Sequence, residues 1–572
     1  MASRRNASLH FLFTPLRLRA ACGRSAFRIG LGLGAALLAS APALAQVPGS
    51  GSAAGANAGV RNYRIPAGPL DQALTRYASE AGVELSVDAA LTRGKQTPGL
   101  AGNYTVLDGF AGLLQGQGLR VVRGNGGAYS LRPAQADGAT TLPAVTVTGT
   151  AETAWSAVDG YVATRSATGT KTDSTILETP QSISVVTADF IKESGASRLK
   201  ESLAYTPGIN TSPWGADTRF DWTIIRGFDA QTPGYYLDGL QLRNNNSWAV
   251  WQTEVYGAER IEVLRGPTSV LYGQNGAGGM INVVSKRPTD EPLRELEVQM
   301  GNHDRRQVAG DFSGPLDENG KVLYRITGLA RDAELPASGL PNDRFFIAPA
   351  LTLKPSSDTT LTLLSHYLRV RDGSSYASFP EIGTQLPNPN GKFSRNTYVG
   401  EPGFDRFNQE QWMIGYLLEH RLNDTWTVRQ NTRYGYTSVD YRQIYVRGGF
   451  ATVNPDNPDD AANFRLLERY PFGSQENARL FTIDNQAQAK VGLGDWKHTF
   501  LFGLDYQHSR NYQRTYNDGV VDPIDGYSPV YGSRVETAAP WFDATTRLAQ
   551  TGLYLQDQIK SVSYTHLRAH ET

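Results

Sequence analysis

Apolar and polar positions alternate along the second half of the chain, from residue 291 onward. Trp426, Tyr434 and Tyr436 fall on one face of an extended segment, and Arg429 and Arg433 fall on the other. The same alternation recurs in 324–331 and 499–507. A period of two predicts β-strands, here with one aromatic-rich apolar face and one polar face.

The connections between these strands alternate in length. Tight turns are predicted at 355–358, 423–424 and 492–495, and long irregular stretches at roughly 370–409, 440–475 and 510–545. A soluble sandwich also alternates along its strands. Alternating short turns and long loops, however, are typical of strands that thread a membrane. The pattern therefore favours a transmembrane antiparallel β-barrel over residues 291–560, with about ten to twelve strands.

The first half of the chain has a different pattern. Within 62–133, apolar residues recur at helical spacing in 70–78 and 106–114, and a hairpin is predicted from 119–123 and 128–131. This part reads as a small α/β domain. Residues 161–290 mix short strands and helices and are expected to form an α+β domain.

A glycine-rich stretch at 260–288, "RIEVLRGPTSVLYGQNGAGGMINVVSKRP", needs an explanation of its own. A phosphate-binding loop requires a strand before the glycines and a helix after them. Here β-branched residues follow Gly279, which predicts a second strand. We therefore expect these glycines to permit close packing, not phosphate binding.

The N-terminus has the pattern of an export signal. Arginines precede an apolar run that ends in Ala43-Leu44-Ala45, which predicts a secretory signal peptide at 1–45 followed by a linker at 46–61. Cleavage removes six arginines and no acids, so the formal net charge of +0 becomes −6. A negative net charge disfavours a nucleic-acid partner. The only cysteine, Cys22, lies inside the signal, so metal-thiolate sites are excluded from the mature chain.

Several motifs together carry a family resemblance. "ETPQSISVVT" (178–187), "IIRGF" (224–228), "YYLDGL" (235–240) and the glycine-rich stretch resemble the plug of TonB-dependent siderophore receptors from the Gram-negative outer membrane. "TGLYLQDQIK" (551–560) resembles one of their barrel strands, and 63–83 is similar to the short N-terminal domain that secretins and signalling receptors share. The resemblance covers nearly all of 62–560.

The resemblance implies a complete architecture. A small α/β periplasmic signalling domain at 62–133 would precede a linker at 134–160, an α+β plug at 161–290 and a barrel that encloses the plug. The TonB box would lie at 142–149, with Pro143, Ala144, Val145, Thr146 and Val147 pairing with TonB as an added strand. The implied partners are TonB, a periplasmic anti-sigma regulator, a ferric siderophore and outer-membrane lipid.

The resemblance also implies where cargo binds. The plug segments above the barrel lumen correspond to 211–222 and 242–251. The expected ligand residues are Trp214, Arg219, Tyr235, Arg243, Asn245, Trp248 and Trp251. Aromatic walls suit a ferric hydroxamate, whereas ferric catecholates would call for more Lys and Arg. The alternative is another cargo, namely a different iron chelate, haem or cobalamin. For Trp222 and Trp251, the alternative to a ligand role is a place in the core of the plug.

Further expectations follow from the family. Arg226 and Arg265 would tie the plug to carboxylates of the barrel lumen, with a locally satisfied arginine as the alternative. Ferrichrome-type receptors carry an arginine where Trp214 stands, which disfavours ferrichrome itself. No enzymatic activity, resident cofactor or metal site is expected, because no catalytic motif is found and the histidines are scattered.

The length of the barrel region departs from the family pattern. The family's barrel has 22 strands, so this chain is expected to be a C-terminally truncated fragment with an incomplete barrel. Residues 561–572, "SVSYTHLRAHET", break the strand pattern and are expected to be a non-native tail. We assign no metal site to His566 and His570.

Overall fold

The computed structural model describes residues 60–123, 128–133, 152–215, 217–336, 338–374 and 378–561. The expected signal peptide at 1–45, nearly all of the linker at 46–61, the TonB box at 142–149 and the tail at 562–572 lie outside the described residues. The chain divides into two compact units, Met1–Val147 and Thr148–Thr572. No helix among the described residues is long and apolar enough to cross a membrane.

The first unit is a small α/β domain. Its elements are β1 (Arg61–Ile65), β2 (Gly68–Pro69), α1 (Leu70–Ala81), β3 (Leu85–Ser86), α2 (Ala89–Thr92), β4 (Gln96–Thr97), β5 (Leu100–Tyr104), α3 (Val106–Leu113), β6 (Leu119–Arg123) and β7 (Tyr129–Pro133). Both predicted helices are confirmed, and so is the pairing of β6 with β7. Leu70, Leu74 and Tyr77 of α1 pack against Phe110 of α3 in one apolar core.

The plug at the start of the second unit is built on a mixed sheet in the order β10-β16-β17-β14-β15. Its elements are β8 (Arg165–Ser166), β9 (Ser174–Thr175), η1 (Ile176–Glu178), β10 (Ser182–Thr187), α4 (Ala188–Ser194), α5 (Leu199–Ser202), β11 (Ile209–Asn210), β12 (Ile224–Ile225), β13 (Phe228–Asp229), β14 (Tyr235–Leu237), β15 (Leu240–Gln241), η2 (Val255–Gly257), β16 (Ala258–Arg265), α6 (Ser269–Tyr272) and β17 (Gly279–Ser285). Ile261, Val263 and Ile281 lie in its core.

The glycine-rich stretch is the connection between two antiparallel strands, β16 and β17. A strand follows the glycines, as predicted. A Cβ on Gly279 would lie 2.0 Å from the Leu264 carbonyl oxygen, and a Cβ on Gly278 would lie 2.4 Å from the Ile225 carbonyl oxygen. The structure therefore confirms that these glycines allow backbone segments to approach closely.

We expect Gly279→Ala to destabilise the plug by about 3 kcal/mol, because the new methyl group overlaps backbone and the residue has a φ of +129°. Gly492→Ala is the matched control, since a Cβ there meets nothing within 4 Å. Urea unfolding of the purified protein measures the stability of both variants. A Gly279→Ala protein as stable as the control would contradict this packing.

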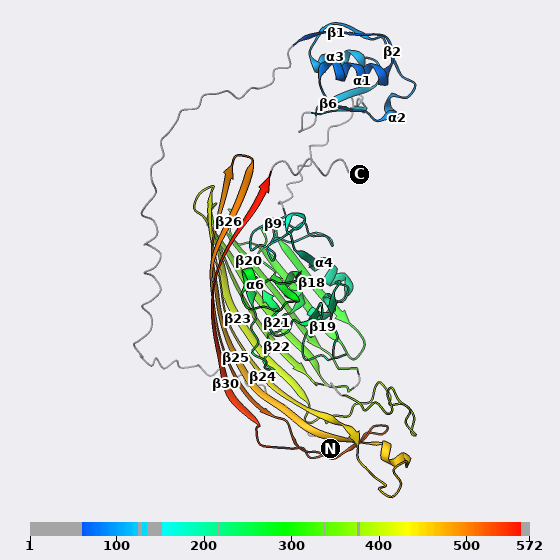
Figure 1. The fold of residues 1–572 in the computed structure, drawn as a ribbon, viewed down its shortest axis with the longest axis vertical. Coiled ribbons are helices and arrows are strands. Elements are labelled where there is room, and N and C mark those ends of the chain that lie inside the picture. Colours follow the sequence, from blue (N-terminus) through cyan, green and yellow to red (C-terminus); the bar gives the residue numbers. More distant parts are fainter. Residues whose placement is uncertain are drawn as a thin grey trace, which may run out of the picture. The chain divides into compact units, whose positions relative to one another are not determined.

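The rest of the second unit is one large antiparallel sheet that curves around the plug (Figure 1). Its strands are β18 (Leu293–Met300), β19 (Arg306–Pro315), β20 (Val322–Asp332), β21 (Asn342–Ser356), β22 (Thr359–Asp372), β23 (Arg406–Arg421), β24 (Trp426–Phe450), β25 (Leu466–Leu493), β26 (Trp496–Tyr516) and β30 (Phe542–Ser561), in chain order. The short β28 (Ile524–Asp525) pairs with β25, while β27 (Gly519–Val520) pairs with β29 (Glu536–Thr537), and η3 (Ala461–Phe464) precedes β25.

Strand connections define two ends of this sheet. From β21 onward, one end has the turns 357–358, 422–425 and 494–495, and the other has the loops 373–405, 451–465 and 517–541. We call these the short-turn end and the long-loop end. Short and long connections alternate as predicted. The loops are shorter than predicted because β24, β25 and β26 continue well into them.

The alternating faces are confirmed. Tyr434, Phe502 and Leu504 are exposed on the face that points away from the plug. Arg433 is buried on the opposite face, where it forms a 2.6 Å ion pair with Asp238 of the plug. The large sheet thus turns apolar side chains outward and polar side chains toward the plug.

Buried ion pairs join the plug to the strands. Among the described residues, the buried plug–strand pairs include Lys171–Asp484 (2.9 Å), Arg198–Asp372 (3.5 Å), Asp238–Arg433 (2.6 Å), Glu254–Arg344 (2.5 Å), Glu259–Arg325 (3.1 Å) and Lys286–Asp311 (2.8 Å). Their Coulomb energy is strong in a low dielectric, and removal of one partner leaves an uncompensated buried charge. These pairs fix the register between the plug and the sheet.

The structure corrects the role predicted for Arg226 and Arg265. Arg265 donates to the Pro207 carbonyl oxygen and to the hydroxyls of Ser182 and Ser184, all within the plug. The side chain of Arg226 is exposed and forms no ion pair with the strands among the described residues. The sheet register places Arg265 opposite Ser182, which puts its guanidinium beside these partners within the plug.

Candidate functional site

An aromatic cluster lies where the plug meets the long-loop end of the strands. It contains Trp214, Phe220, Trp222 and Trp248 from the plug, and Phe407, Tyr441, Tyr445 and Phe472 from β23, β24 and β25. The Trp248 ring lies 5.6 Å from Phe220, 5.0 Å from Tyr441 and 5.5 Å from Phe472, between ring centroids. Trp214 is 57% exposed and packs edge-on against Trp222.

One buried arginine lies at the centre of this cluster. The Arg219 guanidinium donates to both carboxylate oxygens of Asp217, at 2.9 and 2.7 Å, and to the hydroxyls of Tyr441 and Tyr445. Its carbon Cζ lies 5.5 Å from the Trp248 ring centroid. Burial opposes ionisation of Asp217, but the Arg219 charge and hydrogen bonds hold the pKa of Asp217 below its ordinary value. The two charges neutralise each other, so the cluster has a polar centre without net charge.

The loop that carries this pair is anchored on two sides. Lys200 of α5 donates to the Asp217 carbonyl oxygen, and Trp222 donates its indole N–H to Asp217 at 2.8 Å. Arg198, just before α5, donates to the Thr218 carbonyl oxygen and lies 3.5 Å from Asp372 at the end of β22. These bonds hold the side chains of 217–222 in a fixed arrangement.

The structure brings together three of the seven predicted ligand residues, namely Trp214, Arg219 and Trp248. Two others belong to the core. Tyr235 is buried, and its hydroxyl bonds to Thr223 Oγ1 at 2.6 Å. Trp251 is 4% exposed and donates to the Arg243 carbonyl oxygen. Trp251 is core, as in the alternative reading, because its ring lies against Gly435 of β24, and Tyr235 is core because its hydroxyl is held within the plug by Thr223 and the Asp221 carbonyl oxygen.

The last two predicted residues form a neighbouring polar edge. Asn245 donates to the Ser509 hydroxyl of β26 at 3.0 Å. Arg243 donates to Gln274 Oε1 at 2.8 Å and is half-buried. Both side chains therefore have partners in the plug or the sheet, and their ligand role stays a prediction.

The sequence analysis missed several residues of the cluster, namely Asp217, Phe220, Phe407, Tyr441 and Phe472. Strand parity could have found Tyr441. Tyr434 and Tyr436 are even-numbered and face outward, so odd-numbered Tyr441 and Tyr445 must face the plug. The alternation of the two faces therefore already indicates that these two tyrosines point toward the plug.

The long loops are held over the cluster by buried polar contacts. Arg469 pairs with Glu401 at 3.0 Å and also donates to the carbonyl oxygens of Val399 and Asp522, which joins two loops to β25. Asp405 accepts hydrogen bonds from the Tyr398 hydroxyl at 2.5 Å and from the Ile444 amide at 2.7 Å. Burial raises the pKa of Asp405 to about 8 despite these bonds, and the nearby Glu401 charge adds to the rise.

This shift predicts a pH-dependent loop. A carboxyl group whose pKa is raised by folding stabilises the folded loop at acid pH, and that contribution declines above pH 4 and is lost as pH rises through about 8. We expect hydrogen exchange in 398–405 to accelerate between pH 5 and 8 beyond the intrinsic pH effect. Asp405→Asn, which stays neutral, should remove the extra acceleration. The same excess in both proteins would contradict the assignment to Asp405.

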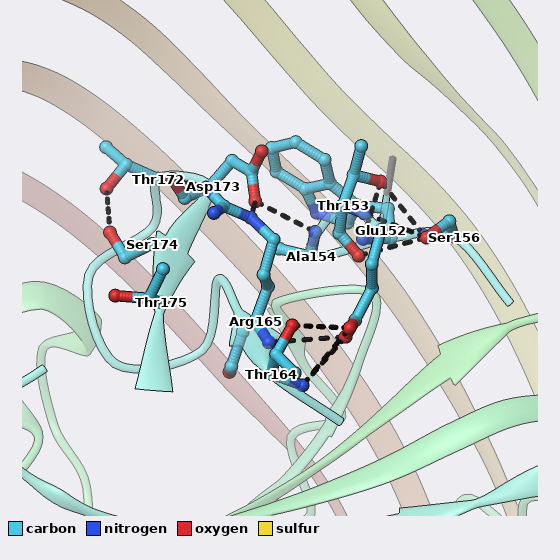
Figure 2. A network of polar contacts seen from close by, with 12 residues as sticks. Glu152, Thr153, Ala154, Ser156, Thr164, Arg165, Thr172, Asp173, Ser174 and Thr175 are labelled. Carbon is cyan, nitrogen blue, oxygen red and sulfur yellow. Dashed lines mark hydrogen bonds and ion pairs between the residues drawn. The ribbon is translucent and has the colours of Figure 1, made fainter. Parts of the chain in front are cut away.

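The first described residues of the second unit, 152–156, are fastened to the plug (Figure 2). The Glu152 carboxylate accepts from the amides of Thr164 and Arg165, at 2.9 and 3.2 Å. Asp173 accepts from the Ala154 amide at 2.9 Å and from Arg165 Nε at 2.7 Å. We call 152–156 the strap, because it crosses the plug surface at the short-turn end.

The strap also covers a cavity between the plug and β22–β25. The cavity has a volume of about 220 Å³, and its lining includes Trp155, Lys171, Arg287, Glu419 and Asp484. The Arg429 guanidinium lies 5.5 Å from the Trp155 ring centroid. A displaced strap would therefore expose polar surface between the plug and the strands.

Three family models match this chain. The TonB-dependent receptor plug domain matches residues 175–280, and the TonB-dependent receptor-like β-barrel matches 350–568. The secretin and TonB N-terminus short domain matches 83–134. The chain belongs to the TonB-dependent receptors.

Relatives of this receptor carry names that concern iron chelates. It is 35% identical over 385 residues to the ferrioxamine B receptor of Salmonella typhimurium (strain SL1344), an alignment that covers 67% of this chain and 53% of the relative. It is 36% identical over 428 residues to the ferrichrome outer membrane transporter/phage receptor of Escherichia coli (strain K12). That alignment covers 71% of this chain and 56% of the relative. The receptor thus spans about half the length of these relatives.

The fold is shared with solved structures. The ferripyoverdine receptor of the Pseudomonas aeruginosa outer membrane, bound to ferripyoverdine, superposes with a TM-score of 0.61 at 21% identity. The superposition covers 87% of this receptor and 63% of that chain. At this identity the similarity establishes the fold alone.

Proposed function

We propose that this protein is an outer-membrane receptor that binds a ferric siderophore of the hydroxamate type and imports it with energy from TonB. The observation that carries the proposal is the aromatic cluster around the Arg219–Asp217 pair. Its rings offer apolar walls, and the arginine at its centre, Arg219, is neutralised by Asp217. A ferric trihydroxamate is a compact complex of low charge and suits such a surface, whereas a ferric tricatecholate is strongly anionic and would require free cations.

The names of the relatives support this cargo class. One relative is a ferrioxamine B receptor and another is a ferrichrome transporter. The outward face of the large sheet supports a membrane location, because exposed Phe502, Leu504 and Leu553 would lie against lipid. Transport here needs no covalent chemistry and no resident cofactor.

The strap supports a mechanical link to TonB. The predicted TonB box at 142–149 ends only three residues before Glu152. A pull on the box would reach the plug first at Glu152 and Ala154, whose bonds to Thr164 and Asp173 lie at the plug surface. The strap would therefore be displaced before the buried plug sheet, and its loss would open the cavity beneath Trp155.

The N-terminal domain supports a signalling role. It folds as its own unit and matches the secretin and TonB short domain. We propose that it reports occupancy of the receptor to a periplasmic anti-sigma regulator. The alternative is the same fold serving another cargo, namely a different iron chelate, haem or cobalamin.

A growth experiment tests the proposed cargo. A siderophore-receptor-deficient strain that carries the complete gene is grown in iron-limited medium with single ferric chelates: ferrioxamine B, ferrichrome, a tricatecholate or haem. We expect growth with a trihydroxamate and none with the tricatecholate or haem. Growth with haem or the tricatecholate alone would reject the hydroxamate assignment.

A further inference from the structure

The cavity under the strap is lined by seven charged side chains. Six of them belong to ion pairs, namely Lys171–Asp484, Asp238–Arg433, Glu262–Arg260 and Glu419–Arg429. The seventh is Arg287, whose Nε is buried without a hydrogen-bond partner. Among the residues that the structure describes, no group forms an ion pair or a hydrogen bond with its guanidinium.

The backbone on both sides of Arg287 is fixed. Lys286 pairs with Asp311 at 2.8 Å, and Arg325 donates to the Arg287 carbonyl oxygen at 2.8 Å. Pro288 follows directly, and a proline ring fixes its own φ. The Arg287 side chain therefore starts from a fixed point beside the cavity. Its charge also persists, because an arginine stays protonated inside a protein.

The charges around the cavity do not cancel. With the partners that lie outside the lining, they comprise five cations, Lys171, Arg260, Arg287, Arg429 and Arg433, and four carboxylates, Asp238, Glu262, Glu419 and Asp484. The group thus has a net charge of +1. A buried charge without a counter-ion is costly, so this arrangement is unfavourable unless an anion compensates it. One monovalent anion would suffice.

The size and lining of the cavity indicate the kind of anion. Its volume of about 220 Å³ is far more than the ~10–15 Å³ that a single water needs. Trp155 and Leu417 give it an apolar side, and Thr360 adds a hydroxyl. The guanidinium fork matches the two oxygens of a carboxylate. These features fit a carboxylate with a short apolar chain better than a halide ion or a multiply charged phosphate.

We propose that Arg287 binds the carboxylate of a small organic monoanion in this cavity, with the apolar part of the ligand against Trp155 and Leu417. Because Trp155 belongs to the strap, the bound anion touches the strap, the plug and the strands at once, and it stabilises the closed arrangement of all three. The cavity shares no residue with the aromatic cluster. The inference therefore does not depend on the proposed cargo.

The test is isothermal titration of the purified receptor in a neutral detergent and a zwitterionic buffer. The probes are sodium butyrate, sodium chloride and sodium phosphate at equal ionic strength. The variants are Arg287→Gln and, as the matched control, Arg226→Gln. Arg226 is another plug arginine, and its side chain is exposed and forms no ion pair with the strands among the described residues. Urea unfolding without butyrate measures the stability of each variant.

We expect saturable binding of one butyrate per receptor, with chloride and phosphate at least tenfold weaker. Arg287→Gln should bind butyrate at least tenfold more weakly, and Arg226→Gln should behave like the unaltered receptor. Without butyrate, Arg287→Gln should be at least as stable as the unaltered receptor, because it removes an uncompensated charge. A clear loss of stability in that variant would instead assign Arg287 a partner within the protein and overturn the proposal.

Three results of the titration would also overturn it. The first is no saturable butyrate binding by the unaltered receptor. The second is equal butyrate binding by Arg287→Gln, which would place the anion elsewhere. The third is binding of chloride or phosphate as tight as that of butyrate, which would indicate a site that recognises charge alone.

Discussion

Replacing Trp248 by alanine is expected to weaken the binding of a ferric trihydroxamate tenfold to hundredfold. The Trp248 ring is half-buried and joins the plug rings to those of β24 and β25, so its loss removes a wall of the cluster and exposes the Arg219–Asp217 pair to water. Aromatic anchors of this kind carry much of the energy in binding sites. Equilibrium binding of radioactive ferric ferrioxamine B to the purified receptor measures the effect.

Trp426→Ala is the matched control for this prediction. Trp426 lies on the outward face at the short-turn end of β24, and its ring stacks on Phe502 at a centroid distance of 6.3 Å. Its replacement removes the same side chain without touching the cluster, so affinity should stay within twofold of the unaltered receptor. Equal losses for Trp248→Ala and Trp426→Ala would show that the effect is one of folding.

Replacing Val147 by proline is expected to abolish uptake while binding is kept. Val147 lies outside the described residues, and the prediction comes from its place in the predicted TonB box. Strand addition relies on backbone N–H donors, and proline removes one of them and clashes with a paired neighbour. We expect uptake of radioactive iron to fall to the level of a strain without TonB.

Val147→Ala keeps the backbone donor and serves as the control. It should retain most of the uptake, because the pairing depends on the main chain. Normal uptake by Val147→Pro would place the TonB contact elsewhere. Loss of binding by the same variant would show that the change acts on the fold of the receptor.

The periodic features of this fold could be predicted from the sequence. The two faces of β24 follow from alternation alone, because the strand has a period of two and one face is apolar. The ends of the long strands could not be predicted. β24 and β25 stay paired as far as Val446 and Arg469 and, after a register shift, Phe450 and Leu467, well past the outward-facing Tyr434 and Tyr436, so the apolar stripe does not mark where these strands end.

The candidate site was predictable only in part. Trp214, Arg219 and Trp248 lie in two short plug segments whose tryptophans stand out in the sequence. Their partners Tyr441, Tyr445 and Phe472 come from strands more than 190 residues later in the chain, which local patterns do not connect. The ion pairs illustrate the same limit, because Lys171 meets an aspartate 313 positions later. Arg265, chosen from its motif, bonds instead to the serines beside it in the plug sheet.

The most direct test of the account is a comparison of two iron chelates on one receptor preparation. Equilibrium dissociation constants are measured for ferric ferrioxamine B and for a ferric tricatecholate on the purified receptor. The neutral polar centre formed by Arg219 and Asp217 predicts binding of the hydroxamate at least tenfold tighter than that of the tricatecholate. Equal or tighter binding of the tricatecholate would contradict the central claim.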